Sequence, residues 1–408
     1  MNIWLISKYA GLPWYGTAGA RLYHLARHFA QHGHRVVLLT SDANHLATFP
    51  ETRQRYNREE RDGVQTCWIK TRKYKTTASV GRILSWIDFE RWLFRMPTAD
   101  FPAPDVVIVS SLSLLTVVYG GYLKKKYGAK LVFEVRDIWP LTMVAEGGFP
   151  RWHPLVRLLG WIERYGYRKA DLVVGTMPRL DLHVREVLGH EVPFHCCPLG
   201  YAQEDLQGAT EIPSVIPTES FPEGKFTVGY AGSIGLTNAL DPLVESIERL
   251  SGRKDIHFVI LGDGDKKKEY MGRLAGRTNV AFIPRVAKSD VPSILARCDV
   301  LYLSTFDSPV WRFGQSMNKV VEYMLAGKPV VASYSGYRSM LNEAECGVFV
   351  PSGDADQLVE AFLMFADMPR ETREAMGRRG REWILRNRSY GVLAEAYLNA
   401  IRSLPPTG

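Results

Sequence analysis

The chain has 408 residues, of which 46% are hydrophobic and 23% charged, so it is long enough for two packed domains and is neither disordered nor fibrous. Its 51 Lys and Arg residues outnumber 43 Asp and Glu residues, and residues 53–95 alone hold 11 basic and 5 acidic residues. Five cysteines without metal-ligand spacing suggest neither a disulfide framework nor a zinc site, and they favour a reducing cytoplasm.

The first seven residues are a short apolar run without a basic leader or a small-residue cleavage site. They predict a first β-strand and no signal peptide. Residues 106–123 carry no charge, and this length reaches the lower limit for a membrane span. Serines and glycines interrupt the stretch, and three lysines follow it, so we predict a buried strand, a polar turn and a helix.

Short runs rich in Val, Ile and Leu alternate with helical stretches along the chain. Such alternation is typical of parallel sheets covered by helices. The predicted strands cover residues 3–7, 36–40, 106–109, 131–134, 172–175, 227–231, 257–262, 280–283, 300–304, 330–333 and 347–350.

The alternation breaks between residues 203 and 225, where prolines and glycines gather without periodicity. We therefore predict an α/β protein with two facing, doubly wound parallel-sheet domains and a ligand cleft between them. The first domain covers residues 1–205, a linker covers 206–224, and the second domain covers 225–385. A C-terminal helix of about 386–408 is expected to pack back on the first domain.

A glycine-containing loop follows the first strand and leads into a helix through His32. Gly16, Thr17, Gly19 and Arg21 lie at this junction. Glycines let a backbone approach a ligand closely, and a helix N-terminus attracts negative charge. The loop does not match G-x-G-x-x-G, which counts against a dinucleotide oxidoreductase, and a plain strand-to-helix turn stays open.

Two stretches, residues 82–95 and 151–162, combine aromatic and basic side chains. The first holds Trp86, Trp92 and Phe94. Both suit helices in an anionic membrane interface, with Arg at headgroup level and Trp at the boundary. Helices that cover the N-terminal sheet would show the same period, so both interpretations stay open.

Charged side chains follow the strand at residues 131–134. Arg136 and Asp137 lie where parallel strands deliver residues to a cleft. A structural role for Asp137, capping the turn or pairing with Arg136, is the alternative.

The second half repeats the strand-and-glycine arrangement, with Gly232 and Ser233 directly after the strand at 227–231. Further on, Asp263 and Asp265 suggest a metal pair that grips a nucleotide diphosphate. Acidic residues are common in such turns and three lysines follow at once, so we expect no metal here.

The most informative segment runs from residue 309 to 332, where a polar turn precedes a helix predicted from Asn318 to Leu325. The free N–H groups of Ser316, Met317 and Asn318 are suited to an anion. Glu322, one turn into the helix, can accept two hydrogen bonds from a vicinal diol while the amides hold a diphosphate. The alternative is a solvated helical glutamate.

This segment, with the Gly-Lys-Pro-Val-Val-Ala-Ser sequence after it, closely resembles the donor-binding element of family-4 retaining glycosyltransferases of the GT-B fold, which has two facing Rossmann-like domains. In that family the second glutamate of an E-x7-E pair binds the ribose of the nucleotide sugar, and it matches Glu322. The first glutamate is replaced by Gly314. The S-x-N-K-x-x-E-Y pattern resembles bacterial N-acetylfucosamine or N-acetylhexosamine transferases of surface-polysaccharide assembly.

The resemblance also indicates where the sequence departs from the family. Many members carry an Arg and a Lys that align with the uncharged Ser233 and Asn238. Neutralising the leaving diphosphate would then rest on the helix N-terminus and a cation such as Lys319, Arg312 or Arg285.

In the first domain the family commonly has an acid near Asp137. The resemblance thus implies that Asp137, with Arg136 beside it, orients the acceptor or stabilises oxocarbenium-like charge.

Together these features predict a retaining glycosyltransferase that moves a sugar, N-acetylated or a 6-deoxy amino sugar, from a UDP-sugar to a polyprenyl-diphosphate-linked saccharide. The expected setting is O-antigen, capsule or exopolysaccharide synthesis on the inner face of the cell membrane, with an anionic membrane surface as partner, no nucleic acid and no metal cofactor. Two alternatives stay open: a GT-B UDP-sugar 2-epimerase and a noncatalytic sugar-nucleotide-binding protein.

Overall fold

The computed structural model describes the chain except for residues 16–19, 44–49, 75–79, 112, 208–212, 214–215 and 407–408. The chain divides into two compact units. Unit 1 comprises Met1–Pro198 and Tyr390–Gly408, and unit 2 comprises Leu199–Ser389. The stretch expected as a linker therefore falls within unit 2, where Ile216 and Phe221 join the hydrophobic core.

Unit 1 is built on an eight-stranded sheet, among the described residues, in the order β3-β4-β2-β1-β5-β6-β7-β8. All neighbours are parallel except β3 and β4. The order reverses between β1 and β5, which is where such sheets open a crevice at their carboxyl ends. The strands are β1 (Asn2–Ile6), β2 (Arg35–Ser41), β3 (Tyr56–Arg61), β4 (Val64–Ile69), β5 (Val106–Ser111), β6 (Lys130–Val135), β7 (Leu172–Gly175) and β8 (Phe194–Cys196).

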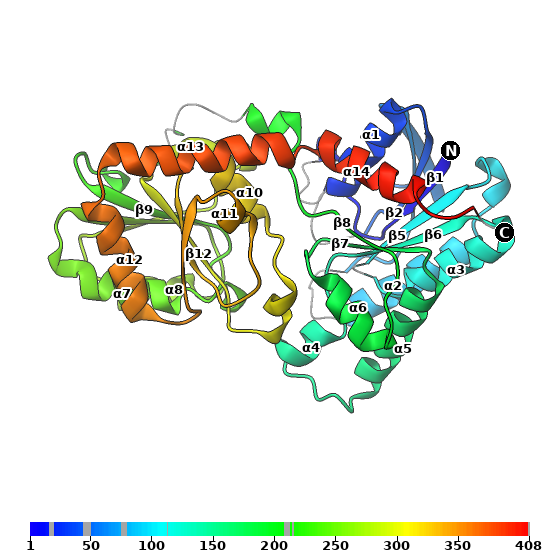
Figure 1. Cartoon of the computed structure of the whole chain (residues 1–408), viewed down its shortest axis with the longest axis horizontal. Coiled ribbons are helices and arrows are strands. Elements are labelled where there is room, and N and C mark those ends of the chain that lie inside the picture. Colours follow the sequence, from blue (N-terminus) through cyan, green and yellow to red (C-terminus); the bar gives the residue numbers. More distant parts are fainter. Residues whose placement is uncertain are drawn as a thin grey trace. The chain divides into compact units, whose positions relative to one another are not determined.

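Helices cover both faces of this sheet, with α1 and α14 on one face and α2, α3, α5 and α6 on the other (Figure 1). The C-terminal α14 is held to α1 by aromatic contacts: the rings of His24 and Tyr390 stack at 5.1 Å, and those of Phe29 and Tyr397 meet edge-on at 5.7 Å. The helices are α1 (Arg21–Gln31), α2 (Val80–Phe94), α3 (Thr116–Tyr127), α4 (Leu141–Ala145), α5 (Pro154–Lys169), α6 (Leu180–Leu188) and α14 (Tyr390–Arg402).

Unit 2 contains a parallel sheet of six described strands in the order β11-β10-β9-β12-β13-β14, which reverses between β9 and β12. Separate hydrophobic clusters fill its two faces, under α10, α11 and α13 on one side and α7, α8 and α12 on the other (Figure 1). The elements are β9 (Phe226–Ala231), β10 (Ile256–Leu261), β11 (Val280–Ile283), β12 (Val300–Ser304), β13 (Val330–Ser333), β14 (Gly347–Val350), α7 (Asp241–Arg249), α8 (Lys267–Arg273), α9 (Val291–Ala296), α10 (Asn318–Leu325), α11 (Met340–Glu343), α12 (Ala355–Asp367) and α13 (Arg370–Asn387).

The two parallel-sheet α/β units confirm the predicted fold class. Residues 106–123 form β5 and most of α3, as the interrupted apolar pattern predicts. Within the described part of the chain, no helix is long and apolar enough to cross a membrane.

Candidate functional site

The first turn of α10 lies beside the end of β9, where the strand order of unit 2 reverses. Tyr323, which is fully buried, fixes this position because its hydroxyl accepts a hydrogen bond from the backbone N–H of Ala231 at 3.0 Å. The helix begins at Asn318 after Met317, with no side-chain cap. Its first N–H groups have no intrahelical partner and lie near the switch point, where parallel sheets bind ligands.

Lys319 extends from this first turn to the loop after β9. Its Nζ donates hydrogen bonds to the Tyr230 hydroxyl at 2.7 Å and to Asn238 Oδ1 at 2.6 Å. Gly232 leaves room for the chain: a Cβ there would stand 2.3 Å from Lys319 Cε, and the backbone has φ of +155°. Burial lowers the pKa of Lys319 to about 8, although the negative charge of Glu322 opposes this shift.

Glu322 lies one turn further along α10, on the same face as Lys319. Burial raises the pKa of its carboxyl, Asp205 adds to the shift, and Lys288 and Lys319 oppose it. Among the described residues, no hydrogen bond reaches the Glu322 carboxylate, and Lys288 is paired with Asp205 at 3.3 Å. A half-buried carboxylate with free acceptor capacity suits ligand hydroxyl groups better than a solvated role.

The other predicted donor residues have different surroundings. Ser316 Oγ accepts a hydrogen bond from the Leu199 N–H at 2.8 Å, so this hydroxyl fixes the loop before α10. The Ser233 carbonyl accepts from the Tyr230 hydroxyl at 2.6 Å. Arg285 follows β11, its side chain is exposed, and no described contact joins it to Lys319 or Glu322.

A pocket of about 550 Å³ opens beside the turn that leads to α10, at the carboxyl ends of β12 and β13. Its lining residues are Asp307, Ser308, Pro309, Arg312, Ser335, Gly336 and Tyr337. Neither Lys319 nor Glu322 lines it, so this hollow is distinct from the polar groups described above.

Asp263 and Asp265 follow β10 in a tight turn. Asp263 Oδ1 accepts a hydrogen bond from the Gly264 N–H at 3.0 Å, as in an ordinary turn. In the described ranges of the chain, no group of three or more His, Cys, Asp and Glu side chains is arranged to hold a metal ion.

In unit 1, Asp137 stabilises the turn between β6 and α4. Its Oδ2 accepts from Trp139 Nε1 at 2.7 Å, and its Oδ1 accepts from Thr142 Oγ1 at 2.8 Å. Both carboxylate oxygens thus have internal donors, which agrees with the structural alternative and leaves each oxygen with one lone pair for a ligand.

Arg136 differs from its neighbour, because no hydrogen bond or ion pair reaches its guanidinium from the residues that the structure describes. Burial, followed by the positive charge of Arg21, lowers its pKa, while Glu134 and Asp137 oppose the shift. A guanidinium repels a positive oxocarbenium, so of the two expected roles only acceptor orientation suits Arg136.

The glycine-containing loop is partly outside the described residues, which exclude Gly16, Thr17 and Gly19. Arg21 is described and is 3% exposed. Its Nη1 pairs with Glu134 at 2.8 Å, and its Nη2 donates to the Cys197 carbonyl at 2.7 Å. The contacts of Arg21 are thus internal to unit 1.

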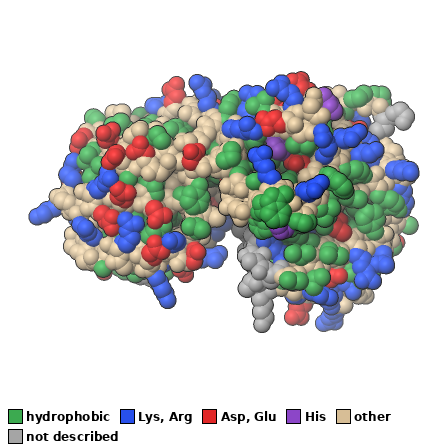
Figure 2. Space-filling view, turned by 90° about the horizontal axis from the view of Figure 1, so that it is seen from below, with side chains coloured by type: hydrophobic (Ala, Val, Ile, Leu, Met, Phe, Trp, Pro, Cys, Tyr) green, Lys and Arg blue, Asp and Glu red, His purple; other side chains and the backbone are tan. Residues whose placement is uncertain are grey.

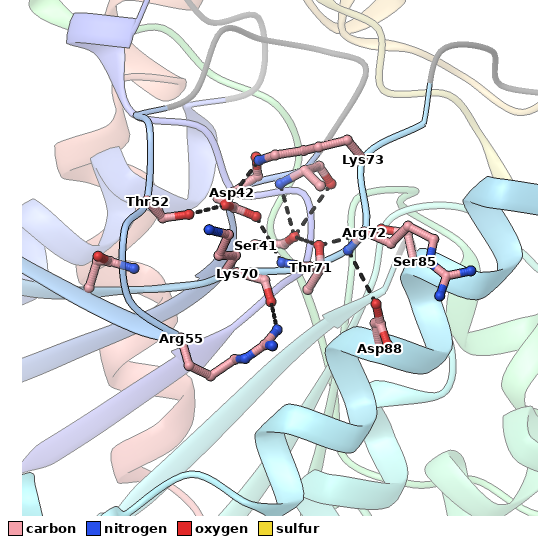
Figure 3. Close-up of polar contacts among 12 residues, drawn as sticks. Ser41, Asp42, Thr52, Arg55, Lys70, Thr71, Arg72, Lys73, Ser85 and Asp88 are labelled. Atoms are coloured by element: carbon pink, nitrogen blue, oxygen red, sulfur yellow. Dashed lines mark hydrogen bonds and ion pairs between the residues drawn. The ribbon is translucent and has the colours of Figure 1, made fainter.

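A polar cluster at the carboxyl ends of β2 and β4 was not among the predicted site residues (Figure 3). Asp42, at its centre, accepts from the Thr71 N–H at 2.9 Å and from the Thr52 hydroxyl, and it pairs with Lys73 at 2.9 Å. These contacts tie the two strand ends together. The sequence signal was the position of Asp42, two residues after the strand predicted at 36–40.

Two further titratable groups of unit 1, Lys8 and Glu90, were not among the predicted site residues. Burial lowers the pKa of Lys8 to about 7, and burial raises that of Glu90 to about 7. Lys8 donates to the Ala43 carbonyl at 2.7 Å, and Glu90 accepts from the Thr116 hydroxyl at 2.6 Å. Both lie near the β1–β5 switch point, the crevice position of unit 1.

The two tryptophans of α2 have contacts within unit 1 that were not expected of membrane anchors. Trp86 points inward, donates its indole N–H to the Tyr9 hydroxyl, and meets the Trp139 ring edge-on at 6.1 Å. Trp92 lies under the guanidinium of Arg55, 3.9 Å from the ring centroid. Both tryptophans are half-buried and contact other residues of unit 1, whereas Phe94, the third aromatic residue expected at the membrane, is 47% exposed.

Two parallel-sheet α/β units, the second with Lys319 and Glu322 on one face of the helix at its switch point, have the architecture of the GT-B class. Comparison with known families agrees with this class. The model described as "Glycosyl transferases group 1" matches residues 225–367, and the "Glycosyl transferase 4-like domain" model matches residues 16–210. The chain is therefore a glycosyltransferase, with a 4-like domain in its N-terminal half and a group 1 domain in its C-terminal half.

A curated relative is the phosphatidyl-myo-inositol mannosyltransferase of Mycolicibacterium smegmatis, 26% identical over 64% of this chain and 72% of that protein. Across the curated relatives, alignments extend over 39% to 72% of the relative's length. Sucrose-phosphate synthase from Thermosynechococcus elongatus has a similar fold, with a TM-score of 0.75 at 16% identity over 99% of this chain and 98% of that one. Anabaena Alr3699/HepE in complex with UDP-glucose gives a TM-score of 0.64 at 14% identity over 99% and 100%.

Proposed function

We propose that this glycosyltransferase moves a hexosyl unit from a UDP-sugar to an acceptor with retention of anomeric configuration. The observation that carries the proposal is the pair formed by Lys319 and Glu322 on one face of α10, beside a helix N-terminus without a cap. A carboxylate suits a ribose diol, and a cation beside free amide groups suits a diphosphate. The complex of the Anabaena protein with UDP-glucose supports this choice of nucleotide.

The acceptor side of the proposal rests on unit 1. We propose a polyprenyl-diphosphate-linked saccharide as the acceptor and an N-acetylated or 6-deoxy amino sugar as the transferred group, within O-antigen, capsule or exopolysaccharide synthesis. Arg136, which has no anionic partner of its own in the described structure, supports an acceptor with negative charge. Turnover of a panel of UDP-sugars with a short-chain prenyl-diphosphate-linked hexosamine tests this pairing, and no transfer to any such acceptor would exclude it.

We also propose that the reaction needs no metal. The leaving diphosphate would be stabilised by the amide groups of α10 and a side-chain cation, which perform the electrostatic role that a metal has elsewhere. Transfer should therefore persist in excess EDTA. Loss of transfer with chelator, restored by Mn²⁺ or Mg²⁺, would contradict this part of the proposal.

The proposed lipid-linked acceptor requires contact with a membrane, and α2, α3 and α5 present the surface for it. Ile87 of α2 is 52% exposed, Trp161 of α5 is 73% exposed, and Trp152, in the turn before α5, is 75% exposed. Hydrophobic and basic side chains are interspersed over this part of unit 1 (Figure 2). Apolar side chains among cations suit an anionic interface.

We expect unit 1 to bind vesicles that contain anionic lipid, and binding to weaken with salt, since each basic residue near such a surface adds about 1 kcal/mol. Replacing Trp152 and Trp161 by Ser should reduce cosedimentation several-fold. Replacing Leu236, an exposed apolar residue of unit 2, should not. Equal binding of all three proteins would show that the exposed aromatic residues do not enter the membrane.

A further inference from the structure

We infer that Lys319 is the cation that stabilises the leaving diphosphate, and that it reaches the phosphates from α10 because the loop after β9 offers no charge. This inference rests on the proposed function and assigns one of its steps to one residue. The loop from residue 232 to 240 contains no charged side chain. Lys319 places its amine against this loop from the opposite side of the switch point.

The hydrogen bonds of Lys319 leave room for a ligand. An ammonium group has three N–H donors. Tyr230 and Asn238, both neutral, accept from Lys319 in the structure, which leaves one N–H for a further oxygen. Because burial lowers the pKa of Lys319 to about 8 and its hydrogen-bond partners bring no negative charge, an anion at this point would favour the charged form.

The position of the amine is fixed by packing as well as by hydrogen bonds. A Cβ at Gly232 would stand 2.3 Å from Lys319 Cε and 2.8 Å from Nζ, so the lysine chain fills the space above this glycine. The ammonium also lies 4.5 Å from the centroid of the Tyr230 ring. A preorganised cation of this kind stabilises developing charge without rearrangement during the reaction.

In the transfer step, the bond between the sugar C1 and the oxygen of the β-phosphate breaks, and its electron pair stays on that oxygen. The acceptor hydroxyl oxygen forms the new bond to C1, and its proton passes to the departing phosphate. Lys319 keeps its proton throughout and hydrogen-bonds to the phosphate oxygens, whose negative charge increases as the bond breaks. Its effect should therefore be larger on kcat than on ground-state binding.

The test uses the full-length protein and two measurements: calorimetric binding of UDP, and UDP release from the UDP-sugar that stabilises the parent most in a thermal-shift screen. Lys319→Met should lower kcat by roughly 100- to 1000-fold, the range for loss of one preorganised oxyanion donor. UDP affinity should fall less. Lys225→Met, at a half-buried lysine directly before β9 and at the other end of that strand from the candidate site, is the matched control and should stay within a few-fold of the parent.

The decisive variant restores the lost positive charge from the loop after β9. Asn238 Oδ1 is 2.6 Å from Lys319 Nζ, so a lysine at position 238 can place its amine at nearly the same point. The double variant Lys319→Met with Asn238→Lys should have a kcat at least tenfold higher than that of Lys319→Met alone. If Lys319→Met alone does not fold, Lys319→Gln, which keeps a polar end but removes the charge, should give the same loss.

A parent that binds UDP and a folded Lys319→Met variant with the kcat of the parent would overturn the assignment while the proposed function stands. A parent that binds no UDP would instead refute the proposed function itself. The two failures are therefore separate.

Discussion

Glu322→Ala should weaken binding of UDP by roughly 10- to 100-fold, because a hydrogen bond to a charged group contributes about 1.5–3 kcal/mol and a methyl group accepts none. The carboxylate is half-buried on α10, and no described residue donates a hydrogen bond to it. Calorimetry on the folded variant measures the loss. Glu343→Ala, at an exposed glutamate of α11, is the control and should bind UDP as the parent does.

The pH dependence provides an independent check on Glu322. Its pKa is raised by burial, then by Asp205, against the opposing charges of Lys288 and Lys319. As the pH falls, the parent should lose affinity for UDP-glucose at a higher pH than an ordinary glutamate would permit, because the protonated group accepts hydrogen bonds less well. UDP-glucose is the suitable probe because its diphosphate is esterified at both ends, so the charge of the probe itself does not change over this pH range. The same affinity loss in Glu322→Ala would mean that another group titrates.

Most of the fold could be predicted from local patterns in the sequence. The helix predicted from Asn318 to Leu325 has those limits in the structure, and the strands predicted at 300–304 and 330–333 coincide with β12 and β13. Each of these strands is a short apolar run between polar turns, and the helix shows the spacing of apolar residues that is typical of helices. Both patterns depend only on residues that are neighbours in the sequence. Parallel strands buried on both faces give especially clear runs.

The β3–β4 hairpin was missed because β3 is not apolar. Its sequence, Tyr-Asn-Arg-Glu-Glu-Arg, lies at the edge of the sheet, where charged side chains prevent further pairing. A search for Val, Ile and Leu runs overlooks such a strand. The turn itself was visible: Asp62 and Gly63 have φ of 53° and 74°, and an Asp-Gly pair is a strong hairpin signal.

The site was predictable only in part, because the partners of its residues come from distant sequence. The contact of Lys319 with Asn238 spans 81 residues, and its contact with Tyr230 spans 89. Sequence could name Lys319 as one of three candidate cations but could not select it. The same limit applies to Arg21, whose partner Glu134 is 113 residues away. The position of Arg21 after the glycine-containing loop suggested that it binds a ligand. In the structure Arg21 is buried and pairs with Glu134 instead.

Arg21→Met should lower the free energy of unfolding of unit 1 by about 3–5 kcal/mol, the cost of leaving a buried ion without its partner. The Glu134 side chain is 0% exposed, and its other oxygen accepts from the Ser110 hydroxyl at 2.7 Å, so no water replaces the guanidinium. Burial is the largest single influence on the pKa of Arg21 and lowers it, but the combined effects of Glu134, Cys197 and Tyr390 outweigh burial and raise this pKa. Urea unfolding followed by circular dichroism measures the change.

A surface ion pair and a double variant show whether the loss comes from the buried charge. Arg185 and Glu191 are 3.4 Å apart, with side chains 56% and 81% exposed, so Arg185→Met should change stability by less than about 1 kcal/mol. Arg21→Met with Glu134→Gln should recover much of the loss, because the neutral amide has a smaller desolvation cost than an unpaired carboxylate. If Arg21→Met unfolds like the parent yet transfers no sugar, the guanidinium acts on a ligand, as its loop position suggested.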